Sequence, residues 1–228
     1  RLFEEMHYAD IAEILDELSF ENALYIVKLI DSEKTSAVLM ELDEDIREKI
    51  LETFSAKEIA EEINELDSDD ATNIISELPH ERKDAVLSQI KDEELLKEIE
   101  ELLTYQENSA GSLMAKELVK VNENWSVLKC VKEMRIQAEE VTKIHSIYVV
   151  DDRNRLKGRL SLKDLLITST KTAISEVYIP RINFVNVHDD LDEVSNKMRK
   201  YDLEAIPVVD NDGILLGRIT IDDIVDLI

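Results

Sequence analysis

The sequence contains few cysteine, glycine, proline and aromatic residues, and it has no long hydrophobic run. Its one cysteine, Cys130, excludes an intramolecular disulfide and a cysteine-rich zinc site, which favours a reducing, cytosolic setting. No apolar segment approaches the ~20 residues of a membrane span, and the N-terminus lacks a signal-peptide pattern. The chain opens at Arg1 without a methionine and stops within an amphipathic pattern. We therefore interpret it as a fragment of a longer protein.

Positive charge is also scarce. The 228 residues include 52 Asp and Glu but only 27 Lys and Arg, which gives a formal net charge of −25. Nucleic-acid binders and proteins that dock on anionic membranes need cationic surfaces, so both classes are disfavoured. The 44% hydrophobic content is sufficient for a folded core. The partners that such a chain attracts are cations.

Catalytic motifs are missing as well. The sequence has no nucleophile elbow, zinc-protease motif, P-loop or dinucleotide-binding glycine pattern. Its four histidines are scattered without a common spacing, and none has a cysteine or carboxylate motif around it: His7, His80, His145 and His188. The sequence therefore predicts a protein that is not an enzyme.

The charge is distributed unevenly along the chain. Residues 1–104 carry 31 acidic and 10 basic side chains, a net charge of −21, and they contain no glycine. Residues 105–228 carry a net charge of −4 and hold all four glycines, together with apolar β-branched runs. The first part is predicted to be nearly all helix and the second part mixed α/β, with a boundary near residues 105–111.

Short amphipathic helices recur within the acidic part. Apolar residues spaced at i, i+3, i+4 and i+7 form single faces, and Leu18, Leu42 and Leu66 follow one another at a constant step of 24. Four residues are typical of helix N-caps: Ser19, Asp43, Ser55 and Ser68. A period of 24 with two helices per unit predicts a helical superhelix, with an irregular helical bundle as the alternative.

A second repeat occupies the mixed part. Residues 147–166 align with residues 206–225 at a constant offset of 59, and 8 of the 20 positions are identical. Each copy reads as strand, polar turn, strand and helix, and each is preceded by another strand and helix. The expected fold is thus α+β multidomain, with an all-α superhelical region followed by two tandem β-α-β-β-α units.

This pair resembles a tandem of CBS domains, whose characteristic motif is Gly-x-h-[Ser/Thr]-x-x-Asp. The motif occurs here at Gly158–Asp164 and again at Gly217–Asp223. Together with the acidic helices and the joint Tyr105-x-x-x-Ser-Ala-Gly-Ser-Leu-Met114, the sequence resembles the cytosolic region of the MgtE family of magnesium transporters and channels. The implied domains are 1–104 (acidic helical), 105–172 (joint and first CBS) and 173–228 (second CBS), without the transmembrane domain of the parent.

Acidic clusters are the strongest chemical feature of the residues themselves. Mg²⁺ prefers oxygen ligands and binds through one or two carboxylates, so the clusters allow Mg²⁺ sites, although helix capping explains any single cluster. The MgtE resemblance implies ligands in the second CBS repeat: Asp192, Asp202, Asp223, Asp226 and the main-chain oxygen of Arg199. Asp222 is a further candidate from the residues themselves, because it lies four positions before Asp226 on a predicted helix, where a divalent cation would offset the repulsion of the two carboxylates. On the helical side it implies Asp70 with Asp67 and Asp69.

The CBS resemblance also implies a nucleotide site. In such modules the Asp of the motif accepts hydrogen bonds from ribose hydroxyls, which matches Asp164 with Ser161, while Lys163 and Arg159 are placed to meet phosphates. Asp223 with Thr220 fits the same role. The structural alternative is that Ser161 and Thr220 only cap their helices. ATP or another adenine nucleotide is thus a possible second ligand beside Mg²⁺.

The function implied by the MgtE resemblance is Mg²⁺ sensing. The chain is expected to form a homodimer through its CBS domains at the cytoplasmic face of the membrane. Mg²⁺ bound at acidic interdomain interfaces would compact it and close the pore domain of the parent chain. One alternative is an adenine-nucleotide-sensing CBS adaptor whose helices dock proteins, and another is an acidic scaffold without a small ligand.

Overall fold

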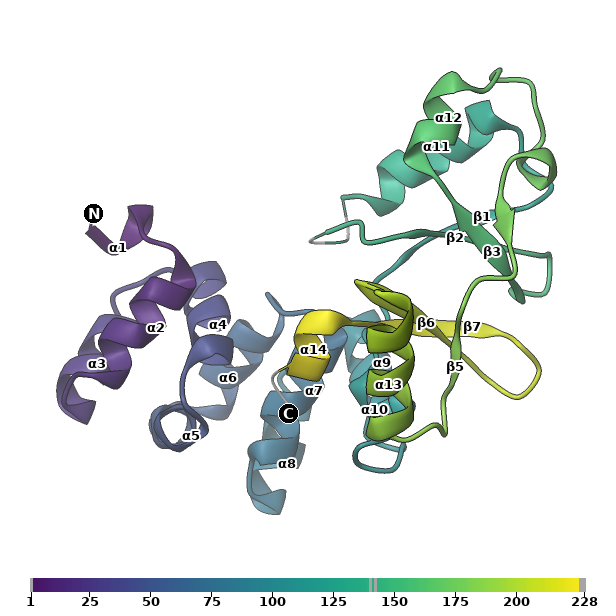
Figure 1. Ribbon diagram of the computed structural model, residues 1–228. Helices are drawn as coiled ribbons and strands as arrows, with labels where there is room; N and C mark the ends of the chain where they lie inside the picture. Colours follow the sequence, from purple (N-terminus) through teal and green to yellow (C-terminus); the bar gives the residue numbers. More distant parts are fainter. Residues whose placement is uncertain (1, 140, 142, 226–228) are drawn as a thin grey trace. The chain divides into compact units, whose positions relative to one another are not determined.

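The computed structural model describes residues 2–139, 141 and 143–225. The chain divides into two units, residues 1–101 and 102–228. Figure 1 shows helices alone in the first unit and strands with covering helices in the second. The predicted α+β organisation, helical region first and CBS-like tandem second, is confirmed. None of the helices in the described ranges combines the length and the apolar character needed to span a bilayer.

The first unit is a linear array of short helices. Their bounds are α1 Leu2–Glu5, α2 Tyr8–Asp16, α3 Phe20–Val27, α4 Ser32–Glu41, α5 Glu44–Thr53, α6 Ala56–Ile63, α7 Ser68–Glu77, α8 His80–Leu87 and α9 Glu93–Leu102. The helices α2, α4, α6 and α8 each begin one predicted repeat after the previous one, and so do α3, α5 and α7. The predicted period with two helices per repeat is therefore confirmed, and each even-numbered helix of this series contacts the next.

Each repeat contributes equivalent residues to one core. Leu15, Leu39 and Ile63 occupy the same position in three successive repeats and are fully buried. Polar contacts also run between neighbouring repeats: the Ser36 hydroxyl donates to the Glu62 carboxylate at 2.9 Å. A two-helix unit cannot bury its own apolar stripe, so stacking supplies most of the stability.

Local capping sets the helix starts. Ser55 forms a capping box with Glu58, and Asp43 and Ser19 occupy N-cap positions as predicted. The prediction of Ser68 as an N-cap is wrong by one residue. Asp67 holds the extended N-cap position of α7, and Ser68 is its first helical residue. Both residue types cap helices well, so the pattern alone did not discriminate between them.

The second unit contains two sheets. In the first, β1 Val119–Asn122 runs parallel to β2 Ile147–Val150, and β3 Leu156–Leu160 is antiparallel to β2 and to β4 Ile179–Pro180. In the second, β5 Val185–Asn186 runs parallel to β6 Ala205–Val209, which is antiparallel to β7 Leu215–Thr220. The remaining elements are α10 Ala110–Leu113, α11 Val127–Gln137, α12 Leu162–Ile167, the 3-10 turn Ile174–Glu176, α13 Leu191–Tyr201 and α14 Ile221–Val225.

The two repeats of this unit exchange edge segments. Residues 179–180, which lead into the second repeat, pair with β3 of the first repeat. Conversely, Ala115, which leads into the first repeat, exchanges two backbone hydrogen bonds with Arg218 on β7. The joint also packs on the second repeat, because the N–H of Gly111 donates to the carbonyl of Val187 at 2.9 Å. Each of the two sheets therefore includes a backbone segment that leads into the other repeat.

Candidate functional site

The end of α13 and the start of α14 lie together in the second repeat. The N–H of Ile221, which begins α14, donates to the carbonyl of Glu204 at 2.9 Å, two residues beyond the C-cap of α13. That C-cap is Asp202, in a left-handed conformation at φ 52°. Carbonyls of a last helical turn have no intrahelical partner, and the partial negative charge of a helix C-terminus favours cations. The main-chain oxygen of Arg199 belongs to this turn.

Asp223 is the most constrained carboxylate at this place. Its Oδ2 accepts the N–H of Thr220 at 2.6 Å, so the side chain caps the start of α14. Burial raises the pKa of Asp223, the hydrogen bonds from Thr220 and the charge of Arg218 oppose that rise, and the neighbouring Asp222 adds to it. A cation close to Asp223 would stabilise its ionised form. The oxygen donors at this place match the ligands that Mg²⁺ prefers.

The other predicted ligands of the second repeat are dispersed. Asp192 lies in the first turn of α13, whereas Asp202 follows the last turn. Ten residues of helix separate them, which is about 15 Å at 1.5 Å per residue. They cannot coordinate one ion together. Asp226 lies outside the described residues.

Three of the predicted ligands cluster at the start of α7 in the helical unit. Asp67 is the N-cap residue, and Asp69 and Asp70 lie in the first turn. The Oδ1 of Asp69 accepts the N–H of Asp70 at 2.9 Å. Carboxylates at a helix N-terminus are stabilised by the helix dipole. Stabilisation of the start of α7 therefore explains this cluster, and its role as a set of Mg²⁺ ligands stays a prediction.

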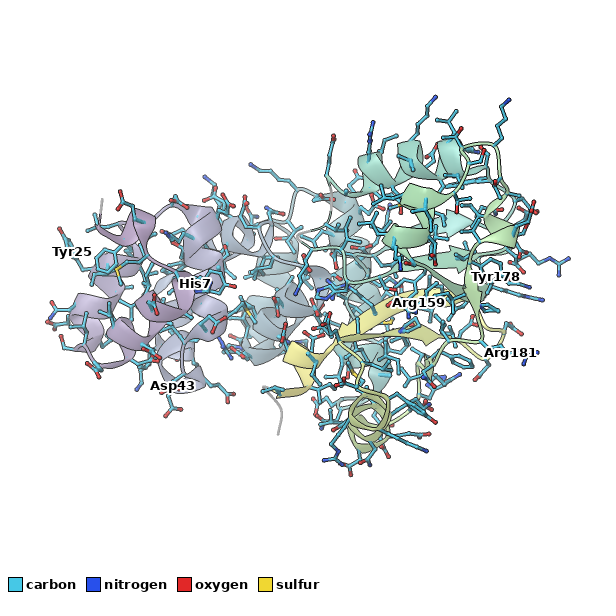
Figure 2. All side chains as sticks on the ribbon, turned by 45° about the horizontal axis from the view of Figure 1, so that its top comes forward. His7, Tyr25, Asp43, Arg159, Tyr178 and Arg181 are labelled. Carbon is cyan, nitrogen blue, oxygen red and sulfur yellow. The ribbon has the colours of Figure 1, made fainter. Side chains whose placement is uncertain are left out.

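The predicted nucleotide residues lie around the start of α12. The hydroxyl oxygen of Ser161 accepts the N–H of Asp164 at 3.4 Å, which is an N-cap contact. Lys163 is exposed in the first turn. Arg159 is exposed on β3, where it pairs with Ile179. Figure 2 shows Arg159 in the same part of this unit as Tyr178 and Arg181. Arg159, Ser161 and Lys163 thus lie where β3 ends and α12 begins.

The structure also identifies residues that the sequence interpretation passed over. Arg218 is only 6% exposed, and its Nε donates to the carbonyl of Glu117 at 2.9 Å. Tyr148 is fully buried beside it, and its hydroxyl has no hydrogen-bond partner among the described residues. Burial raises the pKa of Tyr148, and the charges of Arg218 and Arg159 act in the opposite direction. Arg159 and Arg218 form one of the eight identical pairs in the 20-residue alignment, and that identity was the available signal.

A cavity of about 130 Å³ lies at the tips of the two hairpins. Its lining residues come from both repeats and from the segment between them: Leu156, Lys157, Arg181, Ile182, Phe184, Val209 and Gly213. None of the predicted metal or nucleotide residues belongs to this lining. The cavity therefore does not add to either predicted site.

Comparison with known proteins gives the context for these groups. The family model for the MgtE intracellular N domain matches residues 6–108, and the model for the CBS domain matches residues 110–169 and 174–228. The magnesium transporter MgtE of Thermus thermophilus is 40% identical over 131 residues, which are 58% of this chain. The chain spans only 29% of the length of that relative.

Two solved structures match nearly the whole chain. The soluble part of a magnesium transporter superposes with a TM-score of 0.87 at 29% identity, covering 99% of this chain and 89% of that one. The cytosolic domain of the Mg²⁺ channel MgtE, crystallised in complex with ATP, superposes with a TM-score of 0.91 at 32% identity, covering 100% of this chain and 92% of that one. The chain therefore belongs to the MgtE family of magnesium transporters and comprises its cytosolic region, an N domain followed by paired CBS domains.

Proposed function

We propose that this chain is the Mg²⁺-sensing regulatory region of its parent transporter. Mg²⁺ ions bind at acidic interdomain interfaces, compact the region and close the pore domain of the parent at the cytoplasmic face of the membrane. The net charge of −21 on residues 1–104 supports this proposal, because such a unit repels other acidic surfaces until divalent cations neutralise it. The relatives named as magnesium transporters and Mg²⁺ channels support the choice of ion.

The observation that carries the proposal is the carboxylate of Asp223. This carboxylate is partly buried, and burial raises its pKa. A second carboxylate, that of Asp222, lies in the same first turn of α14. Burial makes an anion there costly despite the hydrogen bonds from Thr220 and the charge of Arg218, and a bound cation would reduce that cost. We assign Asp223, with Asp222, Asp202 and the oxygen of Arg199, to one group of Mg²⁺ ligands, and Asp70 with Asp67 and Asp69 to another. Asp192 and Asp226 complete the proposed set.

The mechanism follows from linkage. An ion shifts the equilibrium between open and compact states only by the amount that it binds the compact state more tightly. Several ions of modest affinity that act together make the response steep. At low Mg²⁺ the acidic surfaces repel and the assembly is open, and at high Mg²⁺ the filled sites hold it compact.

A second copy of the chain is the proposed partner of the CBS domains. Three apolar side chains on α12 are more than half exposed: Leu162, Leu166 and Ile167. Val225 on α14 occupies the position of Leu166 in the other repeat and is also exposed, at 64%. A twofold dimer buries the same surface on both copies, and such exposed apolar faces are typical of interfaces.

The test is small-angle scattering of the chain titrated with MgCl₂, with KCl at matched ionic strength as the control. We expect the radius of gyration to fall in millimolar Mg²⁺ and to change much less in KCl. Asp223→Asn and Asp70→Ala should each weaken the Mg²⁺ response, whereas Asp84→Asn, which removes an exposed acid on α8, should not. Equal shrinkage in both salts would reduce the effect to charge screening and refute the proposal.

Adenine nucleotide binding is a second candidate. The observation in its favour is the 32% identical MgtE cytosolic domain crystallised with ATP. We assign Asp164 and Ser161 to the ribose, and Lys163 and Arg159 to the phosphates. Calorimetric titration with ATP should give saturable binding that Asp164→Ala abolishes, with Asp152→Ala as the control. A nucleotide-driven change in shape without any Mg²⁺ response would favour the CBS adaptor over the Mg²⁺ sensor.

A further inference from the structure

The CBS unit contains a cavity of about 130 Å³ at the tips of its two hairpins, and we refer to it as the tip cavity. Its lining comes from β3, from the β6–β7 hairpin and from the segment that joins the two repeats: Leu156, Lys157, Arg181, Ile182, Phe184, Val209 and Gly213. Val209 is 3% exposed and Phe184 is 50% exposed, so the cavity has a buried floor and an open mouth. Figure 2 shows Arg181 at the outer side of this unit.

The size and the walls of the tip cavity suit a small apolar group. Most of its lining residues carry apolar side chains: Leu156, Ile182, Phe184 and Val209. A Cβ built on Gly213 would meet no atom within 4 Å, so open space reaches this residue. An apolar cavity of about 150 Å³ accepts a benzene ring. The tip cavity can therefore take a group of about that size.

Two cations lie next to each other at the mouth of the tip cavity. The antiparallel pairing of β3 with β4 places Gly158 opposite Pro180, and the same register continued by one residue places Lys157 opposite Arg181. Like charges at such opposite positions repel and are destabilising. Arg181 also adopts a left-handed backbone, with φ 58°, which costs free energy at a residue other than glycine. An anion held between the two side chains would replace their repulsion by attraction.

No carboxylate in the described part of the chain forms an ion pair with either of these cations. The two hairpin turns contain acids, but Asp151 and Asp210 each accept two backbone N–H groups of their own turn, at 2.8 to 3.0 Å. Residues 153–159 hold four basic side chains, all exposed, and no acidic one, although the net charge of the whole chain is −25. The mouth of the tip cavity therefore attracts anions in an otherwise acidic protein.

The other repeat shows that the fold does not require these cations. At the 59-residue offset Leu216 is the equivalent of Lys157. Glu117 is the equivalent of Arg181, because each lies two residues beyond the residue that bridges to the other repeat. The same two positions thus hold an apolar and an acidic residue in one copy and two cations in the other. This difference indicates a ligand site that is specific to the tip cavity.

We propose that the tip cavity binds a small organic anion, a carboxylate or a phosphate ester whose apolar body is about the size of one ring. The body lies against Ile182, Phe184 and Val209, and the charged group lies between Lys157 and Arg181. Because the lining belongs to both repeats, the bound anion holds the two hairpins and the joining segment together. None of the proposed Mg²⁺ ligands or nucleotide residues lines this cavity, so the site is separate from both.

The probes are benzoate for the carboxylate and phenyl phosphate for the ester. Each is titrated into the whole ¹⁵N-labelled chain in Mg²⁺-free buffer at constant ionic strength, and two-dimensional NMR follows the amide signals of Leu156 and Gly213. We expect saturable shifts of both signals, and the tighter of the two probes identifies the charged group. Acetate, which lacks the ring, and benzyl alcohol, which lacks the charge, should bind about tenfold more weakly than benzoate.

Two variants test the two parts of the site. Lys157→Gln with Arg181→Asn removes both cations, and asparagine tolerates a left-handed backbone, so we expect about tenfold weaker binding of benzoate without loss of the fold. Phe184→Ala truncates a wall that is half exposed and should also weaken binding. The control, Lys132→Gln with Arg135→Gln on α11, removes two exposed cations elsewhere in this unit and should bind benzoate unchanged.

Several results would overturn the proposal. One is the absence of saturable shifts at Leu156 and Gly213 with both anions. Equal binding of acetate and benzoate would show that only charge matters, and equal binding of benzoate by the double variant and the original chain would remove the role of the cations. Adenosine, which carries no phosphate, should not displace benzoate, since displacement would place benzoate in the nucleotide site. Unchanged amide signals away from the cavity confirm that each variant is folded.

Discussion

Both units are built from repeats, yet the repeats are joined in opposite ways. In the helical unit a repeat touches its neighbours along the array, through pairs such as Arg47 and Glu77. In the CBS unit the two repeats exchange segments, Ala115 onto β7 and residues 179–180 onto β3. A linear array is stabilised repeat by repeat, whereas a reciprocal pair is closed and is lost or kept as a whole.

The largest effect on stability is expected from substitutions at the two glycines of the CBS unit that contact the exchanged segments. Gly158 and Gly217 are equivalent at the 59-residue offset, and each lets the exchanged segment approach closely. A Cβ on Gly217 would lie 2.5 Å from the Ala115 carbonyl oxygen, and one on Gly158 would collide with the Ile179 carbonyl. Gly158→Ala or Gly217→Ala should each reduce the free energy of unfolding of this unit by about 3 kcal/mol.

The measurement is urea unfolding followed by the fluorescence of Trp125, the only tryptophan, which packs in the first CBS repeat. Gly213→Ala is the control. Its Cβ enters open space, and only the strain of the left-handed backbone, about 1 kcal/mol, is expected. A loss of the same size in all three variants would show that close approach of the exchanged segments is not what stabilises the pair.

A smaller effect on stability, of opposite sign, is expected at the interface between the two CBS sheets. The hydroxyl of Tyr148 is buried there without a hydrogen-bond partner in the described part of the chain. Removing an unsatisfied buried polar group while keeping the ring should stabilise the unit. We expect Tyr148→Phe to raise the free energy of unfolding by about 1 kcal/mol. In the same urea assay Tyr201→Phe, at an exposed ring, should have no effect, and a destabilised Tyr148→Phe would contradict the interpretation.

The smallest effect concerns the contact between two helical repeats. Burial raises the pKa of Glu62 above its ordinary value of 4.5, although hydrogen bonds from Ser36 and Ser32 oppose the rise. A raised pKa means that the folded state binds the proton more tightly, so this contribution to stability is present below about pH 4.5 and is lost as the pH rises through the folded value.

Glu62→Gln keeps an oxygen acceptor for the serines but cannot titrate. Its melting temperature, followed by circular dichroism, should fall less than that of the original chain between pH 4.5 and pH 7. Glu81→Gln on α8 is the control at an exposed acid and should follow the original chain. Identical pH profiles for Glu62→Gln and the original chain would count against burial as the origin of the shift.

Much of the architecture could be predicted because its signals are local and periodic. The leucine spacing in the acidic part anticipated the period of 24, which the structure shows in helices that begin at residues 8, 32, 56 and 80. The 59-residue repeat anticipated both hairpins and the helices after Ser161 and Thr220. The misplaced cap at Ser68 shows the limit of such reasoning, since two adjacent residues were both suitable caps and only the backbone geometry separates them.

The exchanged segments could not be predicted in the same way. Nothing near Ala115 signals that it pairs with Arg218, because a single bridge between distant segments leaves no periodic pattern. Burial of Tyr148 was equally hidden, since a tyrosine in a strand fits either face. For the candidate site, sequence located the acidic residues but not the raised pKa of Asp223, which depends on how strongly its surroundings desolvate it. The assignment of the ligands themselves stays a prediction.

The bond from Arg218 to the carbonyl of Glu117 joins residues 101 positions apart, whereas the Arg47–Glu77 pair of the helical unit joins residues 30 apart. During synthesis the helices can therefore complete their contacts as they leave the ribosome, while β3 waits for residues 179–180 and the contact of Ala115 waits for β7. The acidic helical unit can therefore fold before the CBS unit. Its strong negative charge would keep the nascent chain in solution while the slower, strand-exchanged half is still being assembled.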